Sequence, residues 1–163
     1  MESFINVTSE IGKLNKVMLH RPGREIENLV PDLLEKLLFD DIPYLEVARR
    51  EHDRFAQILK ENDIEVLYLE ELVADALNDN DIKKIFLKQF LKESHISNIE
   101  IYKSLYTYLM SKPTKEMINI LMAGVRKNEI DVKKVHSLRG LIENQYPFYL
   151  DPMPNLYFTR DPG

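Results

Sequence analysis

The sequence predicts an α/β fold with an inserted all-α helical bundle. Two short apolar runs, around Val17 and Val66, flank a long helical pattern, as in a strand-helix-strand unit. The chain then loses β-type patterning, and an apolar, aromatic stretch begins again at Phe148. We therefore expect three parts: residues 1–70 as a first α/β unit, 71–147 as the helical bundle, and 148–163 as a return to the sheet.

The first part consists of a strand, helices and a second strand. The apolar run 16–20 stops at Arg21-Pro22-Gly23, where Pro and Gly end a strand. Pro31 begins a short helix, and a longer one extends from about Leu45 to Asn62. Its apolar stripe consists of Leu45, Ala48, Phe55, Ile58 and Leu59. The run 64–69 then predicts the second strand, which completes a crossover unit.

Helical patterns follow one another through residues 71–147. Four of them are centred on residues 72–76, 82–91, 101–109 and 114–122. Thr114 is the expected N-cap of the fourth helix, and Gly124 lies near its end. A weaker fifth pattern surrounds Leu138, Leu141 and Ile142.

Composition narrows the classes of function. The 163 residues carry a net charge of −5, and no cluster of Lys and Arg indicates a nucleic-acid surface. No apolar run approaches the ~18 residues of a membrane helix. There is no cysteine, which excludes disulfides and a cysteine nucleophile within these residues and fits a cytoplasmic protein. The histidines have no metal-ligand spacing with one another, so we expect no zinc site.

The segment from Asn155 to Asp161 combines polar and aromatic side chains. On a strand, Asn155, Tyr157, Thr159 and Asp161 would share one face. A carboxylate beside an aromatic ring suits a planar cation, because it accepts two parallel N–H bonds while the ring adds cation–π attraction. The alternative is ordinary turn chemistry in Asp161-Pro162-Gly163, with Arg160 paired to a nearby acid.

Other polar positions have simpler interpretations. Asp40 or Asp41 would cap the helix that follows. His52 would lie on a helix surface or pack between elements, and His20 would anchor the turn at 21–23. We favour these structural roles over catalysis for both histidines.

The segment Asp151–Pro162, DPMPNLYFTRDP, resembles the substrate motif of the arginine deiminases. Further matches follow in the family's order: Ser9–Leu14, Leu19–Gly23, Leu37–Pro43, Arg50–Asp53 and Met122–Val125. The helical insertion is similar to that of arginine deiminases and distinguishes them from other amidinotransferase-like families. The resemblance implies a five-bladed α/β propeller, of which this chain would hold the first module, the helical domain and the start of the second module.

The resemblance also implies an activity and a set of roles. The family hydrolyses L-arginine to L-citrulline and ammonia without metal or cofactor, through a cysteine-thiouronium intermediate. Asp161 matches a catalytic carboxylate that clamps the guanidinium, and Asn155 matches a contact to the substrate carboxylate. Phe158 matches an aromatic that packs on the substrate, Arg160 matches a motif arginine, and Leu38 belongs to a loop that covers substrate in relatives. On a regular strand, alternation would place Phe158 and Asp161 on different faces. A bend, bulge or strand end must therefore lie between them if both contact the substrate.

Three functional hypotheses follow. The first is an amino-terminal fragment of an arginine deiminase, inactive alone because the catalytic histidine and cysteine of the family come from later modules. The second is a truncated, non-catalytic module that binds arginine or a protein partner. The third is a structural scaffold without ligand. In each case, we expect homo-oligomers or self-association through exposed strand edges, because a lone module leaves such edges unpaired.

Overall fold

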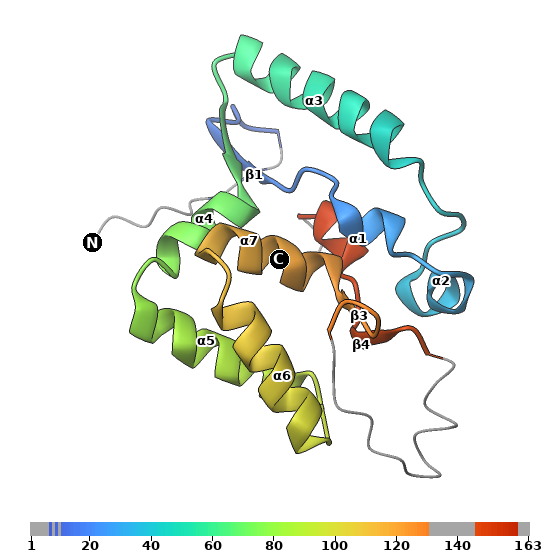
Figure 1. Ribbon diagram of the computed structural model, residues 1–163. Helices are drawn as coiled ribbons and strands as arrows, with labels where there is room; N and C mark the ends of the chain where they lie inside the picture. Colours follow the sequence, from blue (N-terminus) through green and yellow to red (C-terminus); the bar gives the residue numbers. More distant parts are fainter. Residues whose placement is uncertain (1–6, 8, 10, 131–145, 160–163) are drawn as a thin grey trace.

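The computed structural model describes residues 7, 9, 11–130 and 146–159, and it shows a mixed α/β architecture (Figure 1). Strand β1 (Lys16–Leu19) pairs in parallel with β2 (Glu65–Tyr68), with Lys16 opposite Glu65 and Leu19 opposite Tyr68. The connection between them contains α1 (Arg24–Glu27), α2 (Pro31–Leu37) and α3 (Leu45–Glu61). The predicted crossover unit is therefore confirmed.

Local chemistry sets the ends of these helices. Pro31 occupies the first position of α2, where its missing N–H costs nothing, and Leu38 ends that helix in the left-handed region at φ 60°. Asn62 caps the end of α3, as predicted. The expected N-cap at Asp40 or Asp41 is wrong, because α3 begins later, with Tyr44 as its N-cap.

Helix α3 forms where it is predicted, but with a different inner face. Its buried residues are Leu45, His52 and Ala56, which are seven and four residues apart and so share one side of the helix. Phe55 and Ile58, both assigned to the apolar stripe, are 51% and 42% exposed. The buried face of α3 therefore has a histidine at its centre.

The helical bundle contains the four predicted helices. They are α4 (Leu69–Ala76), α5 (Asn80–Glu93), α6 (Ile99–Met110) and α7 (Thr114–Ala123). Asp79 and Asn98 cap α5 and α6 through side-chain oxygens that accept two backbone N–H groups each. The predicted cap at Thr114 is wrong by one position: Pro113 is the N-cap and Thr114 begins the helix. The weak fifth helix lies outside the described residues.

The largest core cluster lies within the bundle. Side chains with no exposed surface include Leu87, Leu91, Leu105, Leu109 and Met117. Val125 and Leu150, from the second sheet described next, belong to the same cluster. None of the helices in the described ranges is long and apolar enough to cross a membrane.

The return to a sheet at Phe148 occurs, but not to the first sheet. Strand β4 (Phe148–Leu150) pairs antiparallel with β3 (Val125–Arg126), a strand too short for periodicity to reveal. Gly124, between α7 and β3, has φ 78°. A Cβ there would meet the carbonyl oxygen of Leu150 at 2.6 Å, so the end of α7 approaches β4 directly.

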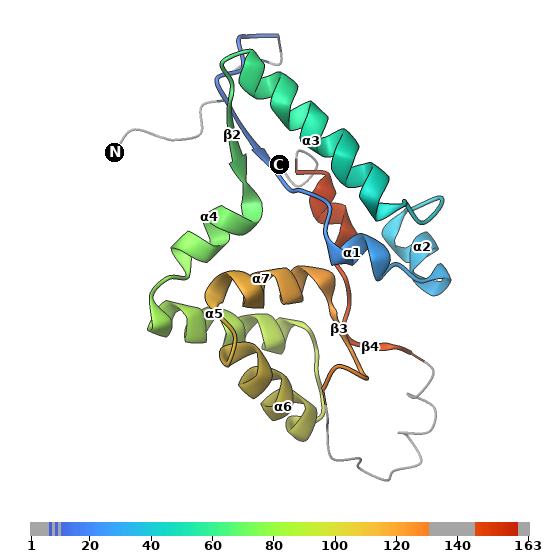
Figure 2. The same cartoon turned by 45° about the horizontal axis from the view of Figure 1, so that its top comes forward.

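The predicted strand over 155–161 is wrong for its described part. A 3-10 helix, η2 (Pro154–Tyr157), replaces it, and the N–H of Phe158 donates to the carbonyl of Asn155 at 3.0 Å. Pro152 and Pro154 favour this outcome, because neither can donate to a strand ladder. The bend, bulge or strand end expected between Phe158 and Asp161 stays a prediction, because Asp161 lies outside the described residues. The 3-10 helix η2 lies between α3 and α7 (Figures 1 and 2).

Candidate functional site

Residues 153–159, here called the motif segment, are held at both ends by backbone oxygens. The N–H of Met153 donates to the carbonyl of Met122 at the end of α7, at 2.9 Å. The hydroxyl of Thr159 donates to the carbonyl of Met18 in β1, also at 2.9 Å. The motif segment therefore connects the helical bundle to the first sheet.

The motif segment exposes two of the predicted site residues. Asn155 is exposed on η2, and Phe158 is 46% exposed immediately after it. The Phe158 ring lies 6.1 Å from the ring of Phe39, centroid to centroid. Leu38, the neighbour of Phe39, is 91% exposed. The fold thus brings the loop that contains Leu38 to the motif segment through Phe39, which the sequence analysis missed.

A second contact ties the end of α2 to the approach of the motif segment. The ammonium of Lys36 lies 3.1 Å from a carboxylate oxygen of Asp151, and the hydroxyl of Tyr146 donates to the other oxygen. Arg160 and Asp161 lie outside the described residues, so their positions in the site stay predictions.

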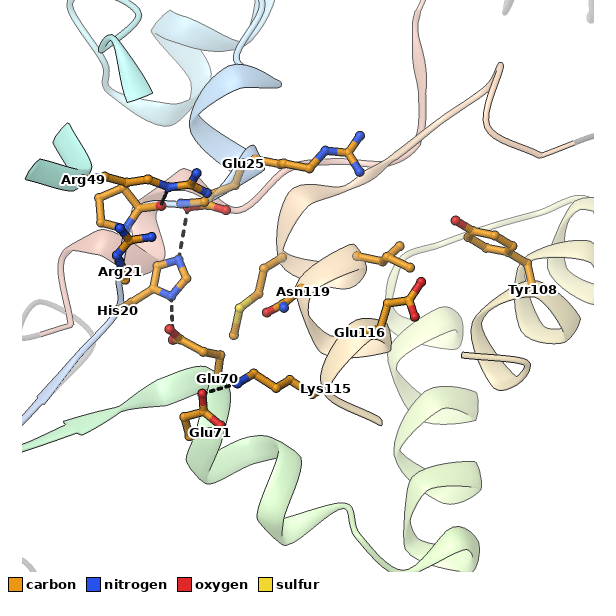
Figure 3. Close-up of a pocket in the computed structure, with 15 residues that line it drawn as sticks. His20, Arg21, Glu25, Arg49, Glu70, Glu71, Tyr108, Lys115, Glu116 and Asn119 are labelled. Atoms are coloured by element: carbon orange, nitrogen blue, oxygen red, sulfur yellow. Dashed lines mark hydrogen bonds and ion pairs between the residues drawn. The ribbon is translucent and has the colours of Figure 1, made fainter. Parts of the chain in front are cut away.

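A cavity of about 470 Å³ lies beside this region, between α1, α4 and α7 (Figure 3). Arg21, Arg49 and Glu25 lie on one side of it (Figure 3). Glu70 and Glu71 line it from α4, and Glu116 lines it from α7. Asn155, Phe158 and Leu38 do not line it. Met122 does, and its carbonyl also holds Met153, so the cavity and the motif segment share this residue.

His20 is a buried charged group on the wall of the cavity. Its Nε2 lies 3.1 Å from a carboxylate oxygen of Glu25, and its Nδ1 lies 3.0 Å from one of Glu70. An ionised carboxylate only accepts hydrogen bonds, so both contacts require the doubly protonated ring. Burial lowers the pKa of His20, but the two carboxylates outweigh it and raise the pKa to about 9.

The expected role of His20 at the turn is confirmed through Glu25, whose carboxylate also accepts the N–H of Gly23. Sequence reasoning missed Glu25 and Glu70, which lie 5 and 50 residues from His20. Only the position of His20 directly after β1 and the acidic start of α4 could have indicated the cluster. In the described part of the chain, no group of three or more acidic, histidine or cysteine side chains is arranged to hold a metal ion.

His52 lies between elements, as one of its two structural interpretations predicts. It is 4% exposed, and its ring lies 6.0 Å from the ring of Tyr68 and 6.4 Å from that of Tyr157. Neither ring nitrogen has a hydrogen-bond partner among the described residues. Burial lowers the pKa of His52. Its seven-residue spacing from Leu45 is the signal that could have placed it on the inner face.

Comparisons with known proteins show which family the sequence matches. A family model described as arginine deiminase matches residues 35–163. Arginine deiminases of Latilactobacillus sakei, Bacillus cytotoxicus (strain DSM 22905) and Bacillus cereus (strain B4264) are each 54% identical over 163 residues. Each match covers 100% of this chain and 40% of the relative. The family model covers more than half of this mixed α/β chain. The chain therefore belongs to the arginine deiminase family.

Proposed function

We propose that these residues form the amino-terminal part of an arginine deiminase, which hydrolyses L-arginine to L-citrulline and ammonia in the cytoplasm. The observation that supports this proposal most directly is 54% identity to arginine deiminases over all 163 residues. Within such an enzyme, residues 1–70 would be the first module of a five-bladed propeller. Residues 71–147 would be the helical domain, and 148–163 would begin the second module.

The motif segment would contribute one side of the arginine site. Asp161 would clamp the guanidinium by two parallel hydrogen bonds, and Asn155 would contact the substrate carboxylate. Phe158 would pack against the substrate, Leu38 would cover it, and Arg160 would supply positive charge nearby. The exposure of Asn155, Phe158 and Leu38 supports these roles, because a ligand can reach all three side chains.

These residues would bind arginine but not hydrolyse it. The covalent step needs a cysteine thiolate that attacks the guanidinium carbon and forms the thiouronium intermediate, and this sequence has no cysteine. Without the nucleophile, the remaining groups can orient the substrate but cannot form the intermediate. The second candidate, a non-catalytic module that binds arginine, makes the same prediction for the chain alone.

Calorimetric titration with L-arginine, together with a citrulline assay, tests the proposal. We expect weak binding, no citrulline above background, and at least roughly tenfold weaker binding in Asp161→Ala, because a charged hydrogen bond is worth about 1.5–3 kcal/mol. Asn155→Ala should weaken binding less. Asn78→Ala, an exposed asparagine after α4, is the matched control and should have no effect.

Two results would contradict the proposal. Equal affinity in Asp161→Ala and Asn78→Ala would mean that Asp161 does not contact the substrate. Citrulline formation by the chain alone would show that a nucleophile other than cysteine operates. Mixing the chain with the remaining part of the Latilactobacillus sakei enzyme and recovering citrulline formation would favour the enzyme fragment over the binding module.

A further inference from the structure

Five aromatic rings form a continuous series across the candidate site, here called the ring series. In spatial order they are Tyr68, His52, Tyr157, Phe158 and Phe39. Successive centroids lie 6.0, 6.4, 5.4 and 6.1 Å apart, within the range in which aromatic pairs attract. The ring series begins at β2, passes through α3 and the motif segment, and ends at the loop after α2.

His52 is the most firmly held residue of the ring series. It is 4% exposed and lies on the inner face of a 17-residue helix. Tyr157 and Phe158 are 44% and 46% exposed and belong to a four-residue 3-10 turn and its cap. A short turn has few contacts of its own, so its orientation depends on what it packs against. For Tyr157, one such support is the His52 ring.

Packing alone does not account for a histidine at this position. A phenylalanine would fill a similar space without burying two polar atoms. The ring nitrogens of His52 are buried and lack hydrogen-bond partners within the described ranges, which costs free energy. Burial of the ring therefore favours its uncharged form.

Burial is the main factor that opposes protonation of His52, and the charged groups around it act in both directions. Burial lowers its pKa most, and the cations Arg21 and His20, at the end of β1, lower it further. Asp53 on α3, 3.9 Å from Nδ1, and Glu70 on α4 act in the other direction. The rings of Tyr68 and Tyr157 face it from β2 and η2.

Because Asp53 is already engaged by Arg21 through two hydrogen bonds, it compensates a charge on His52 only in part. The free-energy cost of a positive charge on the buried His52 ring falls most easily if water enters beside it. The half-exposed Tyr157 is the neighbour that can move away to let water in.

We propose that His52 is a positioning residue for the arginine site, whose uncharged ring supports Tyr157 and thereby holds Phe158 against Phe39. Protonation of His52 releases the motif segment from α3, so the site is assembled at neutral pH and loosened in acid. This role rests on the arginine site proposed above, but its structural part is measurable without any ligand.

Amide NMR of the chain from pH 7.5 to pH 5 tests the structural part. In the wild type, the Asn155, Leu156 and Phe158 signals should shift towards disordered values with a midpoint below about 6.5. In His52→Phe, which keeps a ring but cannot titrate, they should stay constant. In His52→Ala, they should be shifted at every pH. The Leu121 amide in the bundle core reports that each variant is folded.

His95→Gln is the matched control, because this exposed histidine lies at the end of α5, outside the ring series. It should leave the response of the motif segment unchanged. The inference is overturned if the wild-type signals do not respond to pH, or if His52→Phe responds as the wild type does.

Titration with L-arginine tests the link to the site. Affinity should fall on acidification in the wild type and not in His52→Phe, and His52→Ala should bind roughly 2- to 10-fold more weakly at pH 7.5. If no form binds arginine, the proposed function fails, while the amide signals still decide the role of His52. An acid-sensitive motif segment with pH-independent arginine affinity would overturn the positioning role.

Discussion

Two buried histidines, His20 next to Arg21 and His52 next to Asp53 in the sequence, differ in the direction in which their pKa is shifted. His20 and His52 are equally buried, at 4% exposure each. His20 lies between two carboxylates and its pKa is raised, whereas His52 lies between two tyrosine rings and its pKa is lowered. Burial alone therefore does not decide the charge of a histidine. The partners of its ring nitrogens do.

The largest expected difference between the surroundings of His20 and those of His52 is in the free energy of unfolding lost when each imidazole is replaced. His20→Leu leaves Glu25, 2% exposed, without its cationic partner, so we expect a loss of about 3–5 kcal/mol in the free energy of unfolding. His52→Phe keeps the volume and removes unpaired polar atoms, so its effect should stay below about 1.5 kcal/mol. Urea denaturation at pH 7 measures both. Equal losses would mean that His20 is held only by packing.

A smaller, reversible difference should appear in the pH dependence of stability. The folded pKa of His20, about 9, lies above its ordinary 6.5, so its contribution is complete below pH 6.5 and is lost as the pH rises through about 9. The folded pKa of His52 is lowered, so stability should decrease as the pH falls below about 6.5. Thermal unfolding between pH 5.5 and pH 9.5 should show a decrease in stability at each end of the range, here called the acid and the alkaline limb.

The variants His20→Leu and His52→Phe distinguish the alkaline decrease in stability from the acid decrease. His20→Leu should remove the alkaline limb, and His52→Phe should remove the acid one. A variant that removes the other limb would reverse the assignment of charge states.

The smallest expected effect concerns the contact between the two regions. Arg21 Nε and Nη2 donate to the two carboxylate oxygens of Asp53 at 2.7 and 2.8 Å, but both side chains are substantially exposed. Asp53→Asn should therefore cost less than about 1 kcal/mol. Because Asp53 raises the pKa of His52, this change should also move the His52 titration to lower pH, as NMR of the ring protons would show. An unchanged titration would show that the regions are electrostatically independent.

The elements of this fold were predictable where periodicity or capping chemistry is strong. Helices α4 to α7 have apolar residues at helical spacing, and the first two strands are bounded by Pro, Gly or Asn. Strand β3 was not predictable, because two residues cannot show an alternation. The 3-10 turn at 154–157 was predicted as a strand, because an alternating pattern was given more weight than two prolines.

The candidate site was predictable in a different way. Asn155 and Phe158 came from a motif, and the structure shows both exposed. Phe39 and His52 were not recognised as part of the site, because their contacts with Phe158 and Tyr157 join residues more than 100 positions apart. Spacing within one helix cannot reveal which distant ring a side chain will contact.

The close approach at Gly124 has a consequence for how function can be lost. Any side chain there would press on the backbone of Leu150 to Pro152, just ahead of the motif segment. A single missense change at this glycine should therefore displace the motif segment, although it alters none of its residues. A genetic screen that reads each loss of function as a ligand-contact residue would misassign this position.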